Sequence, residues 1–431
     1  MKLSRIGRAS LATVVSLAVG LGMTACGGGT IGFMWVLAGK QTSNGSGNSI
    51  TGFKIDNFTG NLTQVVNSPF TAGGINPVQA VVKPGGRYVY VVNTGQPASG
   101  STPSTPGNIS LYSVGGDGIL SFQQTYSTQG DPSSQPVFLQ MDSAGSFLYV
   151  LDTQAPYSQD SQGNQADPVG CPNVRHCGAI SVFSVAGDTG RLTLVTNATT
   201  KNSAGTNITY FPVGPSPTLM KFVSGTLLTV NSPVSDNDNQ TITSYTANAT
   251  SGQLTLTTNT TQATNFRTIT SITTGGNYVF LTDAATNMIS ASTLTNGVLQ
   301  SVTGGPVNNF VTQVTPVWTL TDSTGKFVYV LNSNSTNVTT SSSSIGAYTI
   351  DANGKLTKVS DVNNPYPVGS GPVCMVEDPV NKYVYTSNAN DSSVTGYEIN
   401  KSTGQLNVLR RGSTFAVTGK PSCLVVSGNV N

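Results

Sequence analysis

A seven-residue pattern of alternating aromatic and aliphatic residues recurs along the chain. Its copies read "RYVYVVN" at 87–93, "SFLYVLD" at 146–152, "NYVFLTD" at 277–283, "KFVYVLN" at 326–332 and "KYVYTSN" at 382–388. Aromatic and β-branched residues favour strands, and the closing Asn or Asp favours a turn. Because neither face of the pattern is polar, it predicts a strand buried on both sides in each of several equivalent units.

Three further strands accompany each copy. A Pro-led apolar segment such as "PVWTLTDSTG" precedes it, and a polar loop, an alternating strand such as "ISLYSVGGDG" and a strand opening with Leu or Val follow it. Short strands at even spacing, with turn residues between them, are typical of an all-β repeat architecture. The first strands of the units begin near Pro77, Pro136, Pro217, Arg267, Pro316, Pro372 and Pro421.

The seventh unit is divided between the two ends of the chain. Only its first strand follows Pro421, and three strands that match the remainder lie at 33–66. Pairing the two parts would close a ring and leave only short, protected edges. An open solenoid would not need matching partial units at its ends. We therefore predict an all-β fold, a seven-bladed β-propeller over residues 33–431 with four antiparallel strands per blade.

The first 25 residues have the pattern of an export signal. Three basic residues precede an apolar stretch at 11–23, which is too short for a membrane span, and Cys26 follows small residues. The segment 1–25 resembles a bacterial lipoprotein signal peptide, and a plain secretory signal is the alternative. The resemblance implies a lipid anchor on Cys26, a short tether at 26–32, and an exported protein held at the cell envelope, at the outer membrane, in the periplasm or on the cell surface.

Composition and charge exclude some classes of partner. Charged residues make up 9% of the chain, against about 25% in a typical globular protein. The formal net charge is +2, and no basic run follows the first ten residues, so we expect no nucleic-acid partner. The sequence has no Gly-rich phosphate loop and no serine nucleophile elbow, and we predict no cofactor and no metal site.

Four long insertions fall between second and third strands. They lie at 94–108, 153–178, 232–240 and 333–344, and such connections share one face of a propeller. Because binding residues concentrate on loops carried by a rigid scaffold, this long-loop face and the adjoining channel mouth are the predicted binding surface. Neutral growth of surface loops is the alternative interpretation.

The cysteines suggest two disulfides. Cys171 and Cys177 flank a short polar loop, and an exported protein would join them. Cys374 and Cys423 each lie two residues after the proline that opens a first strand, on neighbouring blades. They would form a second disulfide or remain as two buried thiols.

Acidic residues recur where first strands end. Asp142, Asp322 and Asp378 take matching positions, and Glu377 directly precedes the last of them. Recurrence in register favours a role in capping the following turn over a role in catalysis.

The segments "GGRYVYVVN", "TGKFVYVLN" and "VNKYVYTSN" resemble the YVTN-repeat propellers, in particular the lactonase family related to 6-phosphogluconolactonase. That resemblance implies hydrolysis of a sugar lactone or a related small ester at the channel mouth. His176 is the single histidine, and with Arg175 and Arg267 it forms the candidate catalytic set, for activating water and polarising a carbonyl. The alternative is a non-catalytic binding or scaffolding propeller that recognises a protein or carbohydrate partner through its long-loop face.

Overall fold

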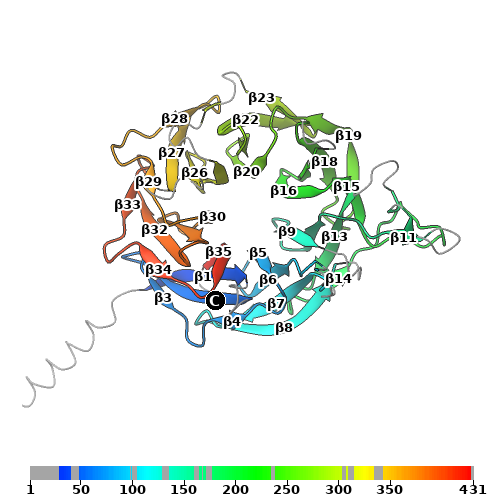
Figure 1. Ribbon diagram of the computed structural model, residues 1–431, viewed down its shortest axis with the longest axis horizontal. Helices are drawn as coiled ribbons and strands as arrows, with labels where there is room; N and C mark the ends of the chain where they lie inside the picture. The colour runs from blue at the N-terminus through cyan, green and yellow to red at the C-terminus, as the bar shows by residue number, and fades with distance from the viewer. Residues whose placement is uncertain are drawn as a thin grey trace, which may run out of the picture.

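The computed structural model describes residues 29–39, 48–97, 99, 104–128, 135–159, 165–166, 168–170, 177–233, 238–302, 307–308, 315–333 and 343–428. These residues form seven antiparallel blades arranged in a ring (Figure 1), so the predicted seven-bladed propeller is confirmed. Within the described ranges, the structure contains no helix long and apolar enough to cross a membrane.

Each blade runs from an inner strand at the centre of the ring to a short outer strand. Blade 1 comprises β35 (Lys420–Gly428), β1 (Thr30–Gly39), β2 (Ser49–Asp56), β3 (Leu62–Gln64) and β4 (Phe70–Thr71). Blade 2 comprises β5 (Pro77–Val82), β6 (Tyr88–Asn93), β7 (Asn108–Val114) and β8 (Leu120–Ser127). Blade 3 comprises β9 (Pro136–Met141), β10 (Phe147–Asp152), β13 (Cys177–Val185), β14 (Leu192–Leu194) and β15 (Phe211–Pro215).

The remaining four blades repeat the same order. Blade 4 comprises β16 (Pro217–Val223), β17 (Thr226–Asn231), β18 (Thr241–Ala247) and β19 (Leu254–Ala263), and blade 5 comprises β20 (Ile269–Gly275), β21 (Tyr278–Asp283), β22 (Met288–Thr295), β23 (Val298–Ser301) and β24 (Val307–Asn308). Blade 6 comprises β25 (Pro316–Thr321), β26 (Phe327–Asn332), β27 (Ser344–Ile350), β28 (Leu356–Lys358) and β29 (Tyr366–Pro367). Blade 7 comprises β30 (Pro372–Glu377), β31 (Tyr383–Asn388), β32 (Ser393–Ile399), β33 (Leu406–Val408) and β34 (Thr414–Ala416).

Two details differ from the sequence expectation. In five blades the third strand pairs with two short outer strands instead of one, as β2 does with β3 and β4. The inner strand of blade 5 begins at Ile269, two residues after Arg267. In addition, β11 (Ser158–Gln159) and β12 (Gln165–Ala166) form a small hairpin in the insertion of blade 3.

The ring closes where the sequence predicts. The C-terminal strand β35 pairs with the N-terminal strand β1, and Trp35 lies opposite Val425 and Val36 opposite Leu424. The facing edges of β1 and β35 are thereby paired, and blade 1 becomes a complete sheet in the order β3-β2-β1-β35.

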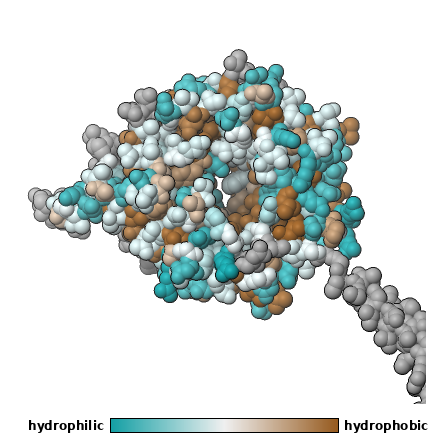
Figure 2. Space-filling view, turned by 180° about the vertical axis from the view of Figure 1, so that it is seen from behind, coloured by the Kyte–Doolittle hydropathy of each residue, from teal (hydrophilic) through white to brown (hydrophobic). Residues whose placement is uncertain are grey.

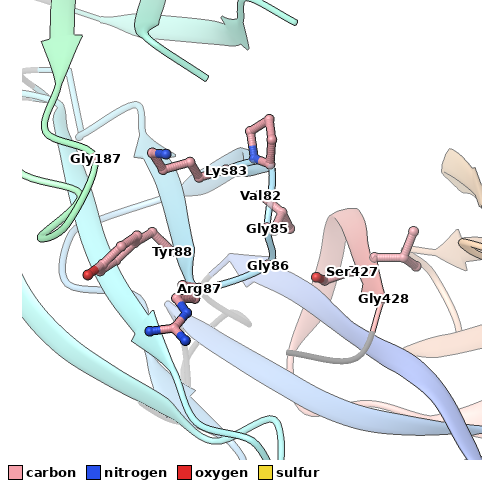
Figure 3. Close-up of a pocket in the computed structure, with 11 residues that line it drawn as sticks. Val82, Lys83, Gly85, Gly86, Arg87, Tyr88, Gly187, Ser427 and Gly428 are labelled. Atoms are coloured by element: carbon pink, nitrogen blue, oxygen red, sulfur yellow. The ribbon is translucent and has the colours of Figure 1, made fainter. Parts of the chain in front are cut away.

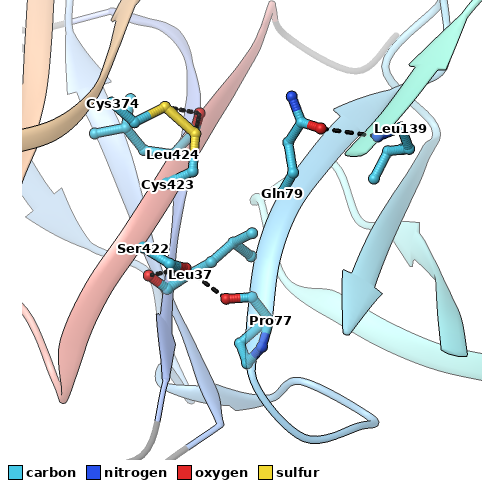
Figure 4. Close-up of a disulfide and its surroundings, with 8 residues drawn as sticks. All are labelled: Leu37, Pro77, Gln79, Leu139, Cys374, Ser422, Cys423 and Leu424. Atoms are coloured by element: carbon cyan, nitrogen blue, oxygen red, sulfur yellow. Dashed lines mark hydrogen bonds between the residues drawn. A yellow bond between two sulfur atoms is a disulfide. The ribbon is translucent and has the colours of Figure 1, made fainter. Parts of the chain in front are cut away.

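A disulfide reinforces this junction. Cys374 on β30 of blade 7 is bonded to Cys423 on β35 of blade 1, with 5.0 Å between the Cα atoms (Figure 4). On the other side of β35, the Ser422 hydroxyl donates to the carbonyl of Pro77 in blade 2. The last strand is therefore fixed to both neighbouring blades as well as to its own.

The core lies between the blades. Second strands such as β10 and β26 are buried along their whole length, as their two apolar faces predict. The Asn or Asp that ends each of these strands is also buried, and it bonds nearby groups. Asn388, for example, donates to the hydroxyls of Ser393 (3.0 Å) and Thr395 (2.9 Å) on the next strand. These polar residues hold the turn at the long-loop face, as the sequence suggests.

Candidate functional site

A central channel runs through the ring, and every inner strand contributes to its wall. The cavity has a volume of about 420 Å³ and is lined by residues of β5, β9, β16, β20, β25, β30 and β35. Figure 2 shows the opening at the centre of the molecule, with hydrophobic side chains along part of its edge. Pockets that take small molecules are concave and largely apolar with a few polar groups, and this cavity has that character.

Hydrogen bonds between inner strands fix the channel wall. The Gln79 side chain on β5 accepts from the backbone N–H of Leu139 on β9 at 2.8 Å (Figure 4), and Gln140 on β9 accepts in the same way from Phe222 on β16 at 2.8 Å. Both glutamines are therefore engaged in joining blades. Trp318, Leu219 and other apolar residues make up much of the remaining surface.

Two of the described lining residues are ionisable, Lys221 on β16 and Glu377 on β30. Lys221 follows Met220 in an otherwise apolar strand, and burial lowers the pKa of its amino group below the usual value. No described residue forms a hydrogen bond or ion pair with the Lys221 ammonium. A partly desolvated cation without a partner attracts a carboxylate, a phosphate or a developing oxyanion.

Glu377 is held in place at the C-terminal end of β30, where a short turn leads to β31. Its carboxylate accepts a 2.8 Å hydrogen bond from the backbone N–H of Ser323 in blade 6. Loss of water around the carboxyl raises the pKa of Glu377 to about 7; the hydrogen bonds from Ser323 oppose this shift, whereas Asp322 and Asp378 add to it. A carboxyl with a pKa close to neutrality exchanges protons readily at physiological pH, which suits a general base.

The neighbouring aspartates have the structural role that the sequence predicts. Asp322 accepts from the backbone N–H of Phe327 at 2.7 Å, and Asp142 does the same with Phe147 at 2.7 Å. Asp378 bonds the N–H of Tyr383 in the matching turn of blade 7. Turn capping by these three residues is confirmed, and Glu377 differs from them because it faces the channel.

The predicted catalytic residues do not meet in this cavity. Arg267 is exposed, precedes β20 at the long-loop face, and is absent from the described channel lining. His176 and Arg175 lie outside the described residues, as do Cys26 and Cys171. Cys177 begins β13 and is disulfide-bonded. The assignment of a catalytic role to His176, Arg175 and Arg267 therefore stays a prediction, and the ionisable residues of the described channel lining are Lys221 and Glu377.

Sequence reasoning assigned Glu377 to turn capping with Asp378, and it passed over Lys221. The signal for Lys221 was present, because "PTLMKFV" is the one inner strand with a cation in its middle. Only the closed ring shows that this position, on blade 4, and the end of the inner strand of blade 7 line the same space.

A second cavity, of about 610 Å³, lies where blades 1, 2 and 3 meet at the face opposite the long-loop face. Its wall is the turn from Val82 to Tyr88, with Gly187 and the end of β35 (Figure 3). The side chains of Lys83 and Arg87 point away from each other in this view, and the Tyr88 hydroxyl donates to the Asp188 carbonyl. Because its cations do not converge, we take the channel as the candidate site.

Comparison with known proteins agrees with this architecture. Residues 313–426, which span blades 6 and 7 and part of β35, match the family model "Lactonase, 7-bladed beta-propeller". The resemblance to the lactonase propellers is confirmed. A comparison with curated proteins finds no match.

Solved structures of similar lactonase-type propellers share the fold over almost the whole chain. A Bacteroides fragilis protein described as a candidate 6-phosphogluconolactonase is 18% identical, with a TM-score of 0.63, covering 92% of this chain and 98% of that one. The periplasmic gluconolactonase of Pseudomonas aeruginosa is 18% identical, with a TM-score of 0.61, covering 93% and 100%. At 18% identity, this similarity shows a shared fold and nothing finer.

Proposed function

We propose that this protein is an exported lactonase-type propeller that hydrolyses a small lactone in its central channel, with Glu377 as general base and Lys221 as the cation for the carbonyl oxygen. The observation that carries the proposal is the Glu377 carboxyl, which lines the channel with a pKa of about 7. The family match supports lactone chemistry, and the apolar wall suits a neutral ring.

The chemistry balances without a cofactor. The Glu377 carboxylate takes a proton from water while the water oxygen adds to the lactone carbonyl, and Lys221 stabilises the oxyanion that forms. The intermediate then breaks the ring C–O bond, and the proton passes from Glu377 to the leaving alkoxide. The product is an open hydroxy acid.

A panel of aldonolactones tests this proposal. We expect the purified full-length protein to open at least one of them, with a rate that rises as pH increases through about 7. Glu377→Gln should lower kcat by a factor of about 10² to 10⁴, the usual contribution of a general base. Glu398→Gln, on the third strand of blade 7 outside the channel lining, is the matched control. If no member of the panel is hydrolysed, the enzymatic proposal fails.

Lys221 has its own test. Lys221→Met keeps the length of the side chain and removes the charge, so we expect a large fall in kcat/KM at constant fold. Lys358→Met, at an exposed position on β28, should leave kcat/KM unchanged. Equal activity of Lys221→Met and the native protein would remove Lys221 from the mechanism.

A non-catalytic binding propeller is the second candidate, favoured by the apolar lining around Trp318 and by the scarcity of ionisable groups in the described channel. In that case the protein would bind a carbohydrate or a protein partner without turnover. Anchoring at the cell envelope through a lipid on Cys26 is part of both proposals. Mass spectrometry of the mature N-terminus tests it, and Cys26→Ser should release the protein into the soluble fraction.

A further inference from the structure

The seam between blades 4 and 5 lacks an aromatic ring that the other blade interfaces possess. In each blade, the Asn or Asp that ends the second strand (Ala38 in blade 1) pairs with a residue of the third strand. When that partner is counted as the first residue, the fifth residue of the third strand is aromatic in six blades. These residues are Phe53, Tyr112, Phe183, Tyr245, Tyr348 and Tyr397. Each packs into the core that its blade shares with the preceding blade. In blade 5 the same position is Ser292.

Blade 4 does not compensate for this loss. Its second strand has Thr226 and Leu228 at two positions that are aromatic in every other blade. In four of those blades the second of these rings also bonds the turn glycine of the next blade, as the Tyr90 hydroxyl does with the Gly190 carbonyl at 2.6 Å. At the blade 4–5 seam, the Gln262 side chain donates to the Gly297 carbonyl at 2.7 Å instead.

A cavity of about 210 Å³ occupies the place of the missing ring. Its floor consists of the buried residues Ile242, Phe266, Leu281 and Ser292, contributed by both blades. Its rim includes Ala263, Asn265 and Ser301, which are exposed, so the space is reached from solvent. Apolar cavities of about 150 Å³ admit benzene, so this one has room for a single six-membered ring.

The register of the strands also provides a hydrogen-bond acceptor. The Tyr112 hydroxyl donates to the carbonyl of Thr71 at 2.7 Å, and the Tyr397 hydroxyl donates to the carbonyl of Pro367. In each case the acceptor residue lies on an outer strand of the preceding blade, where it pairs with the first residue of that blade's third strand. In blade 4 the residue at the acceptor position is Ala263, which pairs with Thr241 and lines the cavity.

We propose that this cavity binds a small free phenol, with the ring in the place of the missing tyrosine and the hydroxyl donating to the Ala263 carbonyl. The apolar floor favours a ring, and the Ala263 carbonyl at the rim selects a ring that carries a hydroxyl at the end nearest the rim. The site is separate from the central channel, and its occupation does not depend on the proposed hydrolysis.

Calorimetry with p-cresol and toluene tests the site on the purified full-length protein. We expect p-cresol to bind with 1:1 stoichiometry and at least fivefold more tightly than toluene, because toluene cannot make the hydrogen bond to Ala263. Ser292→Tyr supplies the ring from the chain itself, and it should weaken p-cresol binding at least tenfold. No saturable binding to the native protein, or unchanged binding by Ser292→Tyr, would overturn the proposal.

Two further measurements cover the case in which Ser292→Tyr does not fold. Ser292→Met fills part of the cavity with a flexible side chain and should weaken p-cresol at least threefold, whereas Thr293→Tyr adds a ring one residue along, outside the lining, and should leave binding unchanged. In the native protein, nuclear Overhauser contacts should join the ring protons of p-cresol to the methyl groups of Leu281 and Leu299. Contacts to other methyl groups alone would contradict the placement.

Discussion

The indole nitrogen of Trp35 on β1 donates a 3.1 Å hydrogen bond to the carbonyl of Gly118, in the turn between the third and fourth strands of blade 2. The Tyr385 hydroxyl on β31 makes the equivalent bond to Gly60 of blade 1 at 2.7 Å. One polar atom on a buried ring thus joins each of these blades to the next, where stacking alone would allow the blades to slide.

Removing one such bond should destabilise the ring measurably. Tyr385→Phe keeps the ring and deletes the hydroxyl, and we expect the free energy of unfolding to fall by about 1–2 kcal/mol because the Gly60 carbonyl loses a buried donor. Urea unfolding followed by tryptophan fluorescence measures the change. Tyr278→Phe, whose hydroxyl bonds an exposed turn, should cost less; equal costs would contradict this account.

The disulfide at the ring junction should stabilise the fold through the unfolded chain. Cys374 and Cys423 are separated by 49 residues, and closing a loop of that length contributes about 4 kcal/mol in the chain-entropy model. The variant with both cysteines changed to Ala should therefore unfold at lower denaturant concentration. Reductant should lower the stability of the native protein towards that of the variant. A variant as stable as the native protein would show that the hydrogen bonds of β35 suffice.

Glu377 should make stability depend on pH in an unusual direction for a carboxyl. Its pKa is about 7 in the folded protein and near 4.5 when unfolded, so the folded state binds more protons between these values. The contribution of Glu377 to the free energy of unfolding is complete below about pH 4.5 and is lost as pH rises through 7. Because the carboxyl is partly exposed, the expected effect is small. Compared with the native protein, Glu377→Gln should have a free energy of unfolding that is higher by only on the order of 1 kcal/mol at pH 8, and this advantage should disappear at pH 5. Unfolding of both proteins at the two pH values tests the sign.

Two glycines with the same backbone conformation should respond differently to substitution. Gly404 has φ of 75°, and a Cβ there would lie 2.3 Å from the Phe327 ring of the preceding blade; Gly205 has φ of 76°, with nothing within 4 Å. Gly205→Ala should cost about 1 kcal/mol, from left-handed backbone strain alone. Gly404→Ala should cost about 1–3 kcal/mol more, since the ring must move. Thermal unfolding of the pair separates the two effects.

The fold was predictable because the sequence states the same pattern many times. Each repeat carried its own strand lengths and turns, and the partial units at Trp35 and Leu424 specified how the ring closes. The split outer strands were less evident, because segments as short as β4 carry too few residues to show a period.

The candidate site was harder to predict because it belongs to no single repeat. Lys221 and Glu377 are 156 positions apart in the numbering, and each looks like a local exception until seven inner strands surround one space. The cavity between blades 4 and 5 was easier to predict from the sequence. Ser292 falls in a column of otherwise aromatic residues along the third strands, but only the folded structure shows that the described neighbours leave the space unfilled.

The partnership of β35 with β1 also sets the order in which the molecule can be completed. Because β1 ends at Gly39 and β35 begins only at Lys420, β1 is made first and must wait for all of the intervening chain to follow. A chain threaded through a membrane from its N-terminus would reach the far side with a vacant strand edge. That edge would need protection from aggregation until β35 arrives, either by a chaperone or by fast translocation of the rest of the chain.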